Sequence, residues 1–370
     1  MLGDCAGCHS SGADSAYSGG LPFTAAFGTV YSPNITPDRT TGIGQWTAGQ
    51  FYRAMHEGIA ANGAPLYPAF PFVYFTHVSR ADSDAIFAYL KTLKPVRAAP
   101  PENKLVFPFN LRALMWFWDA LFFKPGAFHA DPSKSAQWNR GDYIVNGLGH
   151  CAACHTPKNA LFGDETSKAF TGGTEEYWFS ANLRGNTHDG LGKWNVADIV
   201  TYLRTGRNSY ASAAGSMQEK VEQSTSHMNN ADLTAIAVYL KSLPPWPEQA
   251  PSAPNQHTMQ LGQAVFVEHC SVCHLAADSR DYPKLAGDTL VMGRDPLTVE
   301  RIILEGAQSA VTPNAKTTFS MPSFAALSDD DIAAVASYIR NSWGNRASPV
   351  SRGDVAKLRK ALQAANSAVP

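Results

Sequence analysis

One motif of cysteine and histidine occurs three times in the chain. The copies are Cys5-Ala6-Gly7-Cys8-His9, Cys151-Ala152-Ala153-Cys154-His155 and Cys270-Ser271-Val272-Cys273-His274, and together they use all six cysteines. Cys-x-x-Cys-His is the attachment signature of a c-type haem: two thiols form thioethers with the vinyl groups, and the histidine is the proximal iron ligand. A single Cys-x-x-Cys also occurs in redox dithiols and zinc sites, but three copies that each end in histidine favour haem. The sequence therefore predicts three covalently bound haem c groups.

The length and composition of the chain fit three haem-binding domains. Its 370 residues give each motif a unit of about a hundred residues, which is an ordinary domain size. Hydrophobic residues make up 44% of the chain, enough to build a core around each porphyrin. A net charge of −1 argues against nucleic acid as a partner. We predict an all-α fold of three tandem cytochrome c-type haem domains with short helices and long loops.

Each motif opens a unit that closes with a similar helix. Apolar residues at helical spacing, an acidic first turn and a tyrosine recur at 84–91, 232–241 and 331–340. The expected N-caps of these closing helices are Ser83, Asn230 and Ser328. Such self-similarity indicates an internal repeat.

The start of the first unit differs from the starts of the other two. Short amphipathic helices are expected at 141–149 and 259–269, before the second and third motifs, but almost nothing precedes Cys5. We expect the first unit to lack its N-terminal helix. Thioether attachment takes place in an oxidising, periplasm-like compartment, so we also expect an export signal that this chain does not contain.

Proline-rich linkers divide the chain into segments. The expected segments are haem domains at 1–98, 139–246 and 247–345, a linker with an aromatic helix at 99–138, and a tail at 346–370. Trp116-Phe117-Trp118 in the linker cannot all face inward on a helix, so part of this helix is expected to meet a partner, quinone or lipid. The tail carries apolar residues on one helical face, which fits a docking helix or a frayed end.

A low-spin electron-transfer haem needs a second axial ligand, commonly methionine. The third unit offers Met321 before its closing helix, and the second offers Met217 in the loop after Gly206. The first unit breaks this pattern, because Phe70 stands where methionine is expected and a phenyl ring cannot bind iron. We therefore predict Met217 and Met321 as iron ligands beside His155 and His274.

Several candidates remain for the sixth ligand of the first haem, opposite His9. Alignment of the units on Gly58, Gly206 and Gly306 sets Met55 against two aliphatic residues, Leu203 and Ile303. Only the unit without a loop methionine has methionine at this helical position, so Met55 is the favoured ligand. The alternatives are His77, His56 and an open iron.

Further short motifs occur along the chain beside the three haem-attachment motifs. They are Leu2-Gly3-Asp4-Cys5, Phe27-Gly28-Thr29-Val30-Tyr31-Ser32-Pro33-Asn34-Ile35-Thr36-Pro37-Asp38 with Gly42-Ile43-Gly44, Phe107-Pro108-Phe109-Asn110, Arg140-Gly141-Asp142-Tyr143, His155-Thr156-Pro157 and Ser342-Trp343-Gly344-Asn345. With these motifs the chain resembles a known family, the trihaem cytochrome c subunits of bacterial membrane-associated dehydrogenase complexes. This family includes partners of alcohol, aldehyde, gluconate and fructose dehydrogenases.

The resemblance implies a catalytic dehydrogenase subunit that oxidises its substrate on the periplasmic side of the cytoplasmic membrane. The cytochrome subunit would then pass electrons through three haems to ubiquinone of the respiratory chain, at the membrane surface. Pro68-Ala69-Phe70-Pro71 resembles members that pair with molybdenum-cofactor dehydrogenases of aldehydes or N-heterocycles, which implies a small iron–sulfur or accessory subunit as well. Segments 33–35, 182–183 and 283–285 resemble the loop behind the proximal histidine of small c-type cytochromes, where a carbonyl would hold the imidazole.

Three functions follow from these observations. The favoured function is a non-catalytic electron-transfer subunit of an oxidoreductase complex, in which the protein spaces the haems and tunes their potentials. The alternative is a multihaem peroxidase-like enzyme with an open first haem, and Phe70 is the feature that recommends it. A free soluble shuttle is the third, and the aromatic helix argues against it.

Overall fold

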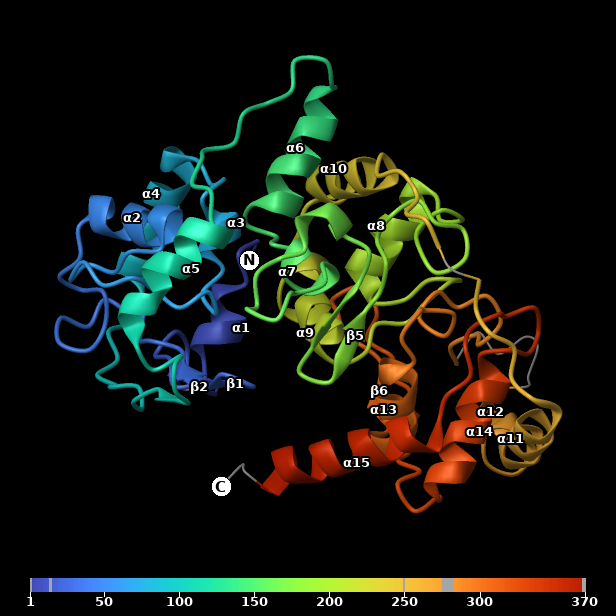
Figure 1. The fold of residues 1–370 in the computed structure, drawn as a ribbon. Helices are drawn as coiled ribbons and strands as arrows, with labels where there is room; N and C mark the ends of the chain where they lie inside the picture. Colours follow the sequence, from blue (N-terminus) through green and yellow to red (C-terminus); the bar gives the residue numbers. More distant parts are fainter. Residues whose placement is uncertain (1, 13–14, 249, 275–281, 368–370) are drawn as a thin grey trace. The chain divides into compact units, whose positions relative to one another are not determined.

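Short helices carry all three motifs in the computed structural model, which describes residues 2–12, 15–248, 250–274 and 282–367 (Figure 1). The motif helices are α1 (Cys5–His9), α7 (Ala152–His155) and α12 (Ser271–His274). The chain forms two compact units, Met1–Ala153 and Cys154–Pro370, and the boundary falls inside the second motif. Helices make up most of the regular structure, as predicted.

The first unit places its helices around a core that includes Met55, and adds a small sheet that the sequence patterns did not indicate. Strands β1, β2 and β3 pair antiparallel in that order, and this pairing satisfies backbone groups of the long loops. The elements of this unit are α1, β1 (Pro22–Ala25), β2 (Gly28–Tyr31), α2 (Ala48–Glu57), α3 (Phe72–Phe75), α4 (Arg80–Thr92), β3 (Lys104–Leu105), η2 (Arg112–Leu114), α5 (Met115–Phe122) and α6 (Ala136–Asn146).

The second unit contains the remaining helices and two short antiparallel strand pairs, β4 with β5 and β6 with β7. Its elements are η3 (Thr166–Lys168), β4 (Gly173–Glu175), β5 (Trp178–Ser180), α8 (Val196–Thr205), α9 (Ser216–Gln223), η4 (Thr225–His227), α10 (Asn230–Lys241), α11 (Gln256–His269), α12, α13 (Leu297–Glu305), β6 (Ala307–Gln308), β7 (Ser320–Met321), α14 (Asp329–Ile339) and α15 (Arg352–Ser367).

The closing helices exist where the apolar pattern predicted them, as α4, α10 and α14. Two of the three predicted N-caps were wrong. Ser79 caps α4 and Asn229 caps α10, each by accepting a hydrogen bond from the backbone N–H three residues later. Ser328 caps α14 as predicted. Ser83 consequently lies one turn inside α4, where its side chain is buried.

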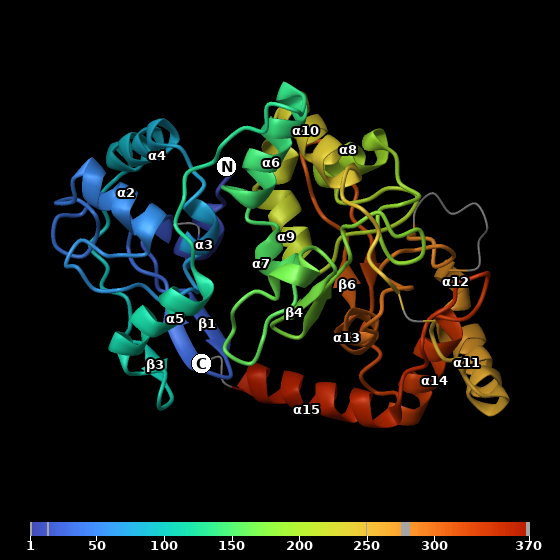
Figure 2. The ribbon, with the colours of Figure 1, turned by 45° about the horizontal axis from the view of Figure 1, so that its top comes forward.

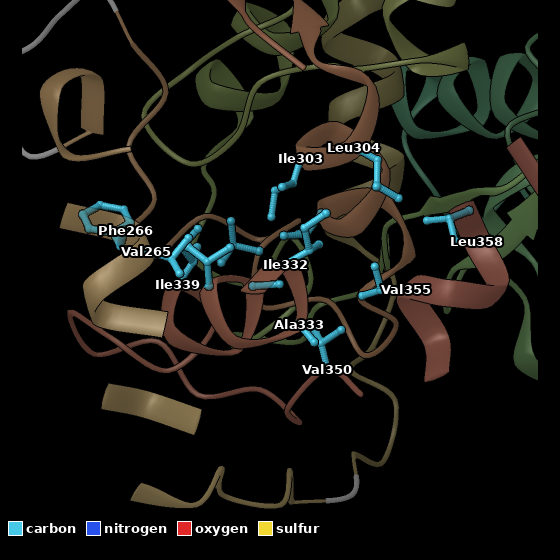
Figure 3. Packing of buried hydrophobic residues seen from close by; sticks show 14 of the residues in the cluster. Val265, Phe266, Ile303, Leu304, Ile332, Ala333, Ile339, Val350, Val355 and Leu358 are labelled. Atoms are coloured by element: carbon cyan, nitrogen blue, oxygen red, sulfur yellow. The ribbon is translucent and has the colours of Figure 1, made fainter. Parts of the chain in front are cut away.

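The helices α11 and α14 pack most closely at Gly262. A Cβ atom at this position would lie 2.1 Å from the carbonyl oxygen of Ala334, so the two backbones are in direct contact. Buried side chains of both helices, including Phe266 and Ile332, form the core beside this crossing (Figure 3). Glycine is therefore needed here because no side chain fits between the helices.

The chain's last described segment is the helix α15, which packs on α13 and α14 (Figure 2). Val355, Leu358 and Leu362 lie on one face of this helix and are buried in the same core as Ile332. Of the two structures expected for the tail, the docked helix is the one observed.

Candidate functional site

Each motif presents two cysteine side chains and one histidine from less than two turns of backbone. All six cysteine side chains are half-buried and free of disulfide bonds. Burial raises the pKa of the Cys5, Cys154 and Cys270 thiols to about 11, so they are protonated at neutral pH. This arrangement can attach a flat group at two points and place an imidazole beside it.

The three motif histidines share one hydrogen-bond arrangement. The Nδ1 of His9 lies 2.7 Å from the carbonyl oxygen of Pro33, and the Nδ1 of His155 lies 2.6 Å from that of Ala181. The corresponding distance from His274 to Pro283 is 3.3 Å. These carbonyls belong to the segments predicted to lie behind the proximal histidine, or directly precede them, so that prediction is confirmed. A carbonyl on Nδ1 fixes the proton there and leaves Nε2 as the nitrogen that can bind iron.

Burial also keeps these imidazoles neutral. Desolvation lowers the pKa of His9, His155 and His274, and the carbonyl contact opposes this shift only in part. Neutral imidazole is the form that binds a metal. The thiol pairs, the neutral rings and the orientation of Nε2 therefore fit covalently attached haem at all three motifs.

Buried asparagines hold two of the carbonyl loops in place. Asn34, directly after Pro33, accepts a hydrogen bond from the N–H of Thr36 and donates to the carbonyl of Val96. Asn182, directly after Ala181, accepts from the N–H of Arg184. Because these loops are fixed by their own hydrogen bonds, they hold the carbonyls that orient the imidazoles.

Two glycines behind the proximal histidines were missed by the sequence analysis. The N–H of Gly19 donates to the carbonyl of His9, and the N–H of Gly172 donates to that of His155. Both have positive φ, and a Cβ at Gly19 would lie 2.5 Å from the backbone of Pro33. Each is the first of a Gly-Gly pair that follows a motif, and this shared pair was the available signal.

Three matching helices support the alignment on which Met55 was selected. Each of α2, α8 and α13 ends at a glycine with positive φ, namely Gly58, Gly206 and Gly306. The residue three positions before each glycine is buried. Met55, Leu203 and Ile303 therefore occupy the same position in three similar helices.

The two loop methionines lie in different local structures. Met321 pairs with Ala307 in β6 and β7, and it packs against the same core as Cys270 of the third motif. Met217 lies in the first turn of α9 rather than in a loop, half-buried against Val221. Lys220 on this helix lies close enough to Cys154 to lower the pKa of its thiol. The ligation of iron by Met217 and Met321 stays a prediction.

Met55 is 4% exposed and belongs to the core of the first unit. The hydroxyl of Ser83 donates a hydrogen bond to its sulfur, with an O–S distance of 3.8 Å. Tyr17 and Ile35, from the segments beside the first motif, pack against the same core. Phe70 also packs there and meets Phe75 edge to face at 5.4 Å between ring centroids.

The two histidines considered as alternatives to Met55 for the sixth ligand lie in surroundings that differ from those of Met55. His77 is hydrogen-bonded to the backbone of Gly126 and lies near Asp142. His56 stacks on Tyr52 at 4.7 Å between ring centroids, on a different face of α2 from Met55. Adjacent residues point about 100° apart on a helix, so the His56 ring points in a different direction from the Met55 side chain.

The aromatic helix of the linker is only partly covered. Phe117 is 70% exposed and Trp116 is 47% exposed, whereas Trp118 packs against Phe72 and Phe122. The prediction that the three rings cannot all face inward is confirmed. Within the described ranges, no helix has the length and apolar character needed to cross a membrane.

Comparison with known proteins gives consistent matches over most of the chain. The cytochrome c family model matches residues 140–244 and 259–343. The gluconate 2-dehydrogenase cytochrome c subunit of Pantoea cypripedii is 37% identical, over 97% of this chain and 87% of that protein. The cytochrome c subunit of the quinone-dependent alcohol dehydrogenase of Gluconobacter oxydans is 35% identical, over 97% and 80%. A nicotinate dehydrogenase subunit of Pseudomonas putida is 38% identical, over 92% of this chain and 29% of that protein.

Proposed function

Because the chain belongs to the cytochrome c subunits of dehydrogenase complexes, we propose that it carries three haems and passes electrons from a catalytic subunit to ubiquinone. One observation carries this proposal. Each motif presents two thiols and a histidine, and a backbone carbonyl holds the Nδ1 of each histidine. Bound haem would supply one-electron chemistry, and the chain would supply ligands, spacing and burial.

The axial ligands are the chain's main means of setting the potentials. We assign His9 with Met55, His155 with Met217, and His274 with Met321. A thioether is a soft donor that favours ferrous iron and raises the reduction potential. Three low-spin haems of this kind fit an electron-transfer subunit and leave no iron open for peroxide.

The count of haems and the iron ligands can be tested on the exported protein. The mature polypeptide should be heavier than its sequence by three haem groups, and replacing both cysteines of one motif with serine should remove one of them. A fully low-spin ferric spectrum is expected. A high-spin haem together with peroxide turnover would instead support the peroxidase-like alternative.

The electron donor is proposed from relatives and from one loop. Cytochrome subunits of gluconate and alcohol dehydrogenases are among the relatives, and so is a subunit of nicotinate dehydrogenase. The phenylalanine at position 70 favours a molybdenum-cofactor dehydrogenase of an aldehyde or N-heterocycle, with a small iron–sulfur or accessory subunit. Purification of the native complex from its periplasmic, membrane-associated location would identify the catalytic partner.

The exposed aromatic rings are the proposed contact with the other members of the electron-transfer pathway. Trp116 and Phe117 offer apolar surface on α5 together with Leu121, which is 69% exposed. Exposed aromatic side chains grouped in this way mark contacts with partners, quinone or lipid. Reduction of a ubiquinone analogue by the substrate-loaded complex, with and without these rings, tests this assignment.

A further inference from the structure

Two buried positions change together between the repeats. At the glycine-terminated helices the residues are Met55, Leu203 and Ile303. Four residues after the N-cap of the closing helices they are Ser83, Leu233 and Ile332, which are 1%, 0% and 0% exposed. The first haem-motif repeat thus has a sulfur and a hydroxyl at these positions, where the other two repeats have only aliphatic groups.

The third haem-motif repeat shows how these two positions pack when both residues are aliphatic. Ile303 of α13 and Ile332 of α14 belong to one hydrophobic cluster (Figure 3). The helices α2 and α4 of the first unit pack against each other in the same way. In the first unit, however, the contact between the two helices includes a hydrogen bond from the Ser83 hydroxyl to the Met55 sulfur.

A buried serine at this position has a cost unless its hydroxyl is used. Burying a hydroxyl without a partner destabilises a protein, whereas leucine or isoleucine would add apolar burial. Packing alone therefore favours an aliphatic residue at the position of Ser83, as the other two haem-motif repeats have. The hydroxyl turns towards the sulfur, and this contact is what the serine adds.

We infer that Ser83 is a positioning residue for the sulfur of Met55 and raises the reduction potential of the first haem. This inference rests on the proposed function, because it requires Met55 as the sixth ligand. A thioether sulfur has two lone pairs, so one can accept the hydrogen bond while the other faces the iron. The hydrogen bond draws electron density from the sulfur, which weakens its donation to ferric iron and favours the ferrous state.

The experiment compares variants of the full-length, haem-loaded protein. Ser83→Ala removes the hydroxyl, and Ser83→Thr retains it. Ser337→Ala is the matched control, because Ser337 is also a fully buried serine of a closing helix, where its hydroxyl contacts the backbone of Val350. Alanine is well tolerated in helices, so these variants are expected to fold. The measurements are redox titration and the near-infrared band of methionine-bound ferric haem.

We expect Ser83→Ala to lower one of the three potentials and to shift the near-infrared band of the same haem. Ser83→Thr should restore both towards the wild-type values, and Ser337→Ala should leave all three potentials unchanged. Unchanged potentials and bands in Ser83→Ala would overturn the inference, as would an equal effect of Ser337→Ala on the first haem.

The variant Met55→Leu distinguishes a failure of the inference about Ser83 from a failure of the proposed ligation of the first iron by Met55. If Met55→Leu removes one methionine band while Ser83→Ala has no effect, the ligand assignment stands and the role of Ser83 is refuted. If Met55→Leu leaves every methionine band in place, both the ligand assignment and the role of Ser83 fail.

Discussion

Because α11 and α14 touch at Gly262, one methyl group added at this residue should strongly destabilise the packing of the two helices. In Gly262→Ala, the added Cβ would lie 2.1 Å from the carbonyl oxygen and 2.7 Å from the carbonyl carbon of Ala334. These are backbone atoms, so no side-chain rotation relieves the overlap. The helices must separate, and their buried side chains, such as Phe266 and Ile332, must lose contacts.

The expected magnitude combines two opposing effects. Overpacking a core costs about 1–3 kcal/mol, and a collision with backbone belongs at the upper end of that range. Alanine in place of glycine in a helix gains about 1 kcal/mol. The net loss is therefore about 2 kcal/mol, or about 30-fold in the equilibrium for local opening.

Hydrogen exchange of the haem-loaded protein measures this opening directly. Amides of α11 and α14 should exchange about 30-fold faster in Gly262→Ala. Gly353→Ala in α15 is the matched control, because its Cβ would meet only the Ser351 hydroxyl at 3.6 Å. That variant should slow exchange in α15 by up to about 5-fold, from helix propensity alone. Equal exchange rates for Gly262→Ala and wild type would refute the close packing of the two helices.

Three further predictions concern the first haem, the aromatic helix and a buried acid. Met55→Leu should remove one methionine near-infrared band, and adding Phe70→Met should restore it by supplying the loop methionine that the first unit lacks; a double variant without the band would contradict this. Replacing Trp116 and Phe117 with serine should abolish assembly with the catalytic subunit while the haem spectra stay unchanged, and it should alter the free energy of unfolding by only about 0.5 kcal/mol because both rings are exposed. Burial raises the pKa of Glu300 from 4.5 to about 7, so its contribution to stability is full below about pH 4.5 and is lost as the pH rises to about 7. Thermal unfolding between these pH values should show a loss of about 3 kcal/mol that Glu300→Gln removes, and an unchanged pH profile in that variant would count against the buried acid.

Local sequence patterns correctly predicted the helices whose formation depends on residues close together in the chain. The helices α4, α10 and α14 follow from apolar spacing, because the same few residues supply both the buried face and the first turn. Their N-caps were predicted less well. Ser83 and Asn230 are good capping residues, but the N-caps in the structure are Ser79 and Asn229, which lie four residues and one residue earlier.

The sequence by itself determined the chemistry of attachment, because both thiols and the histidine of each motif lie within five consecutive residues. Only the tertiary structure decided what surrounds that chemistry. The carbonyl behind His9 comes from 24 residues away, and the serine that meets the Met55 sulfur comes from 28 residues away. No local pattern specifies such pairs, because each depends on how separate helices and loops pack.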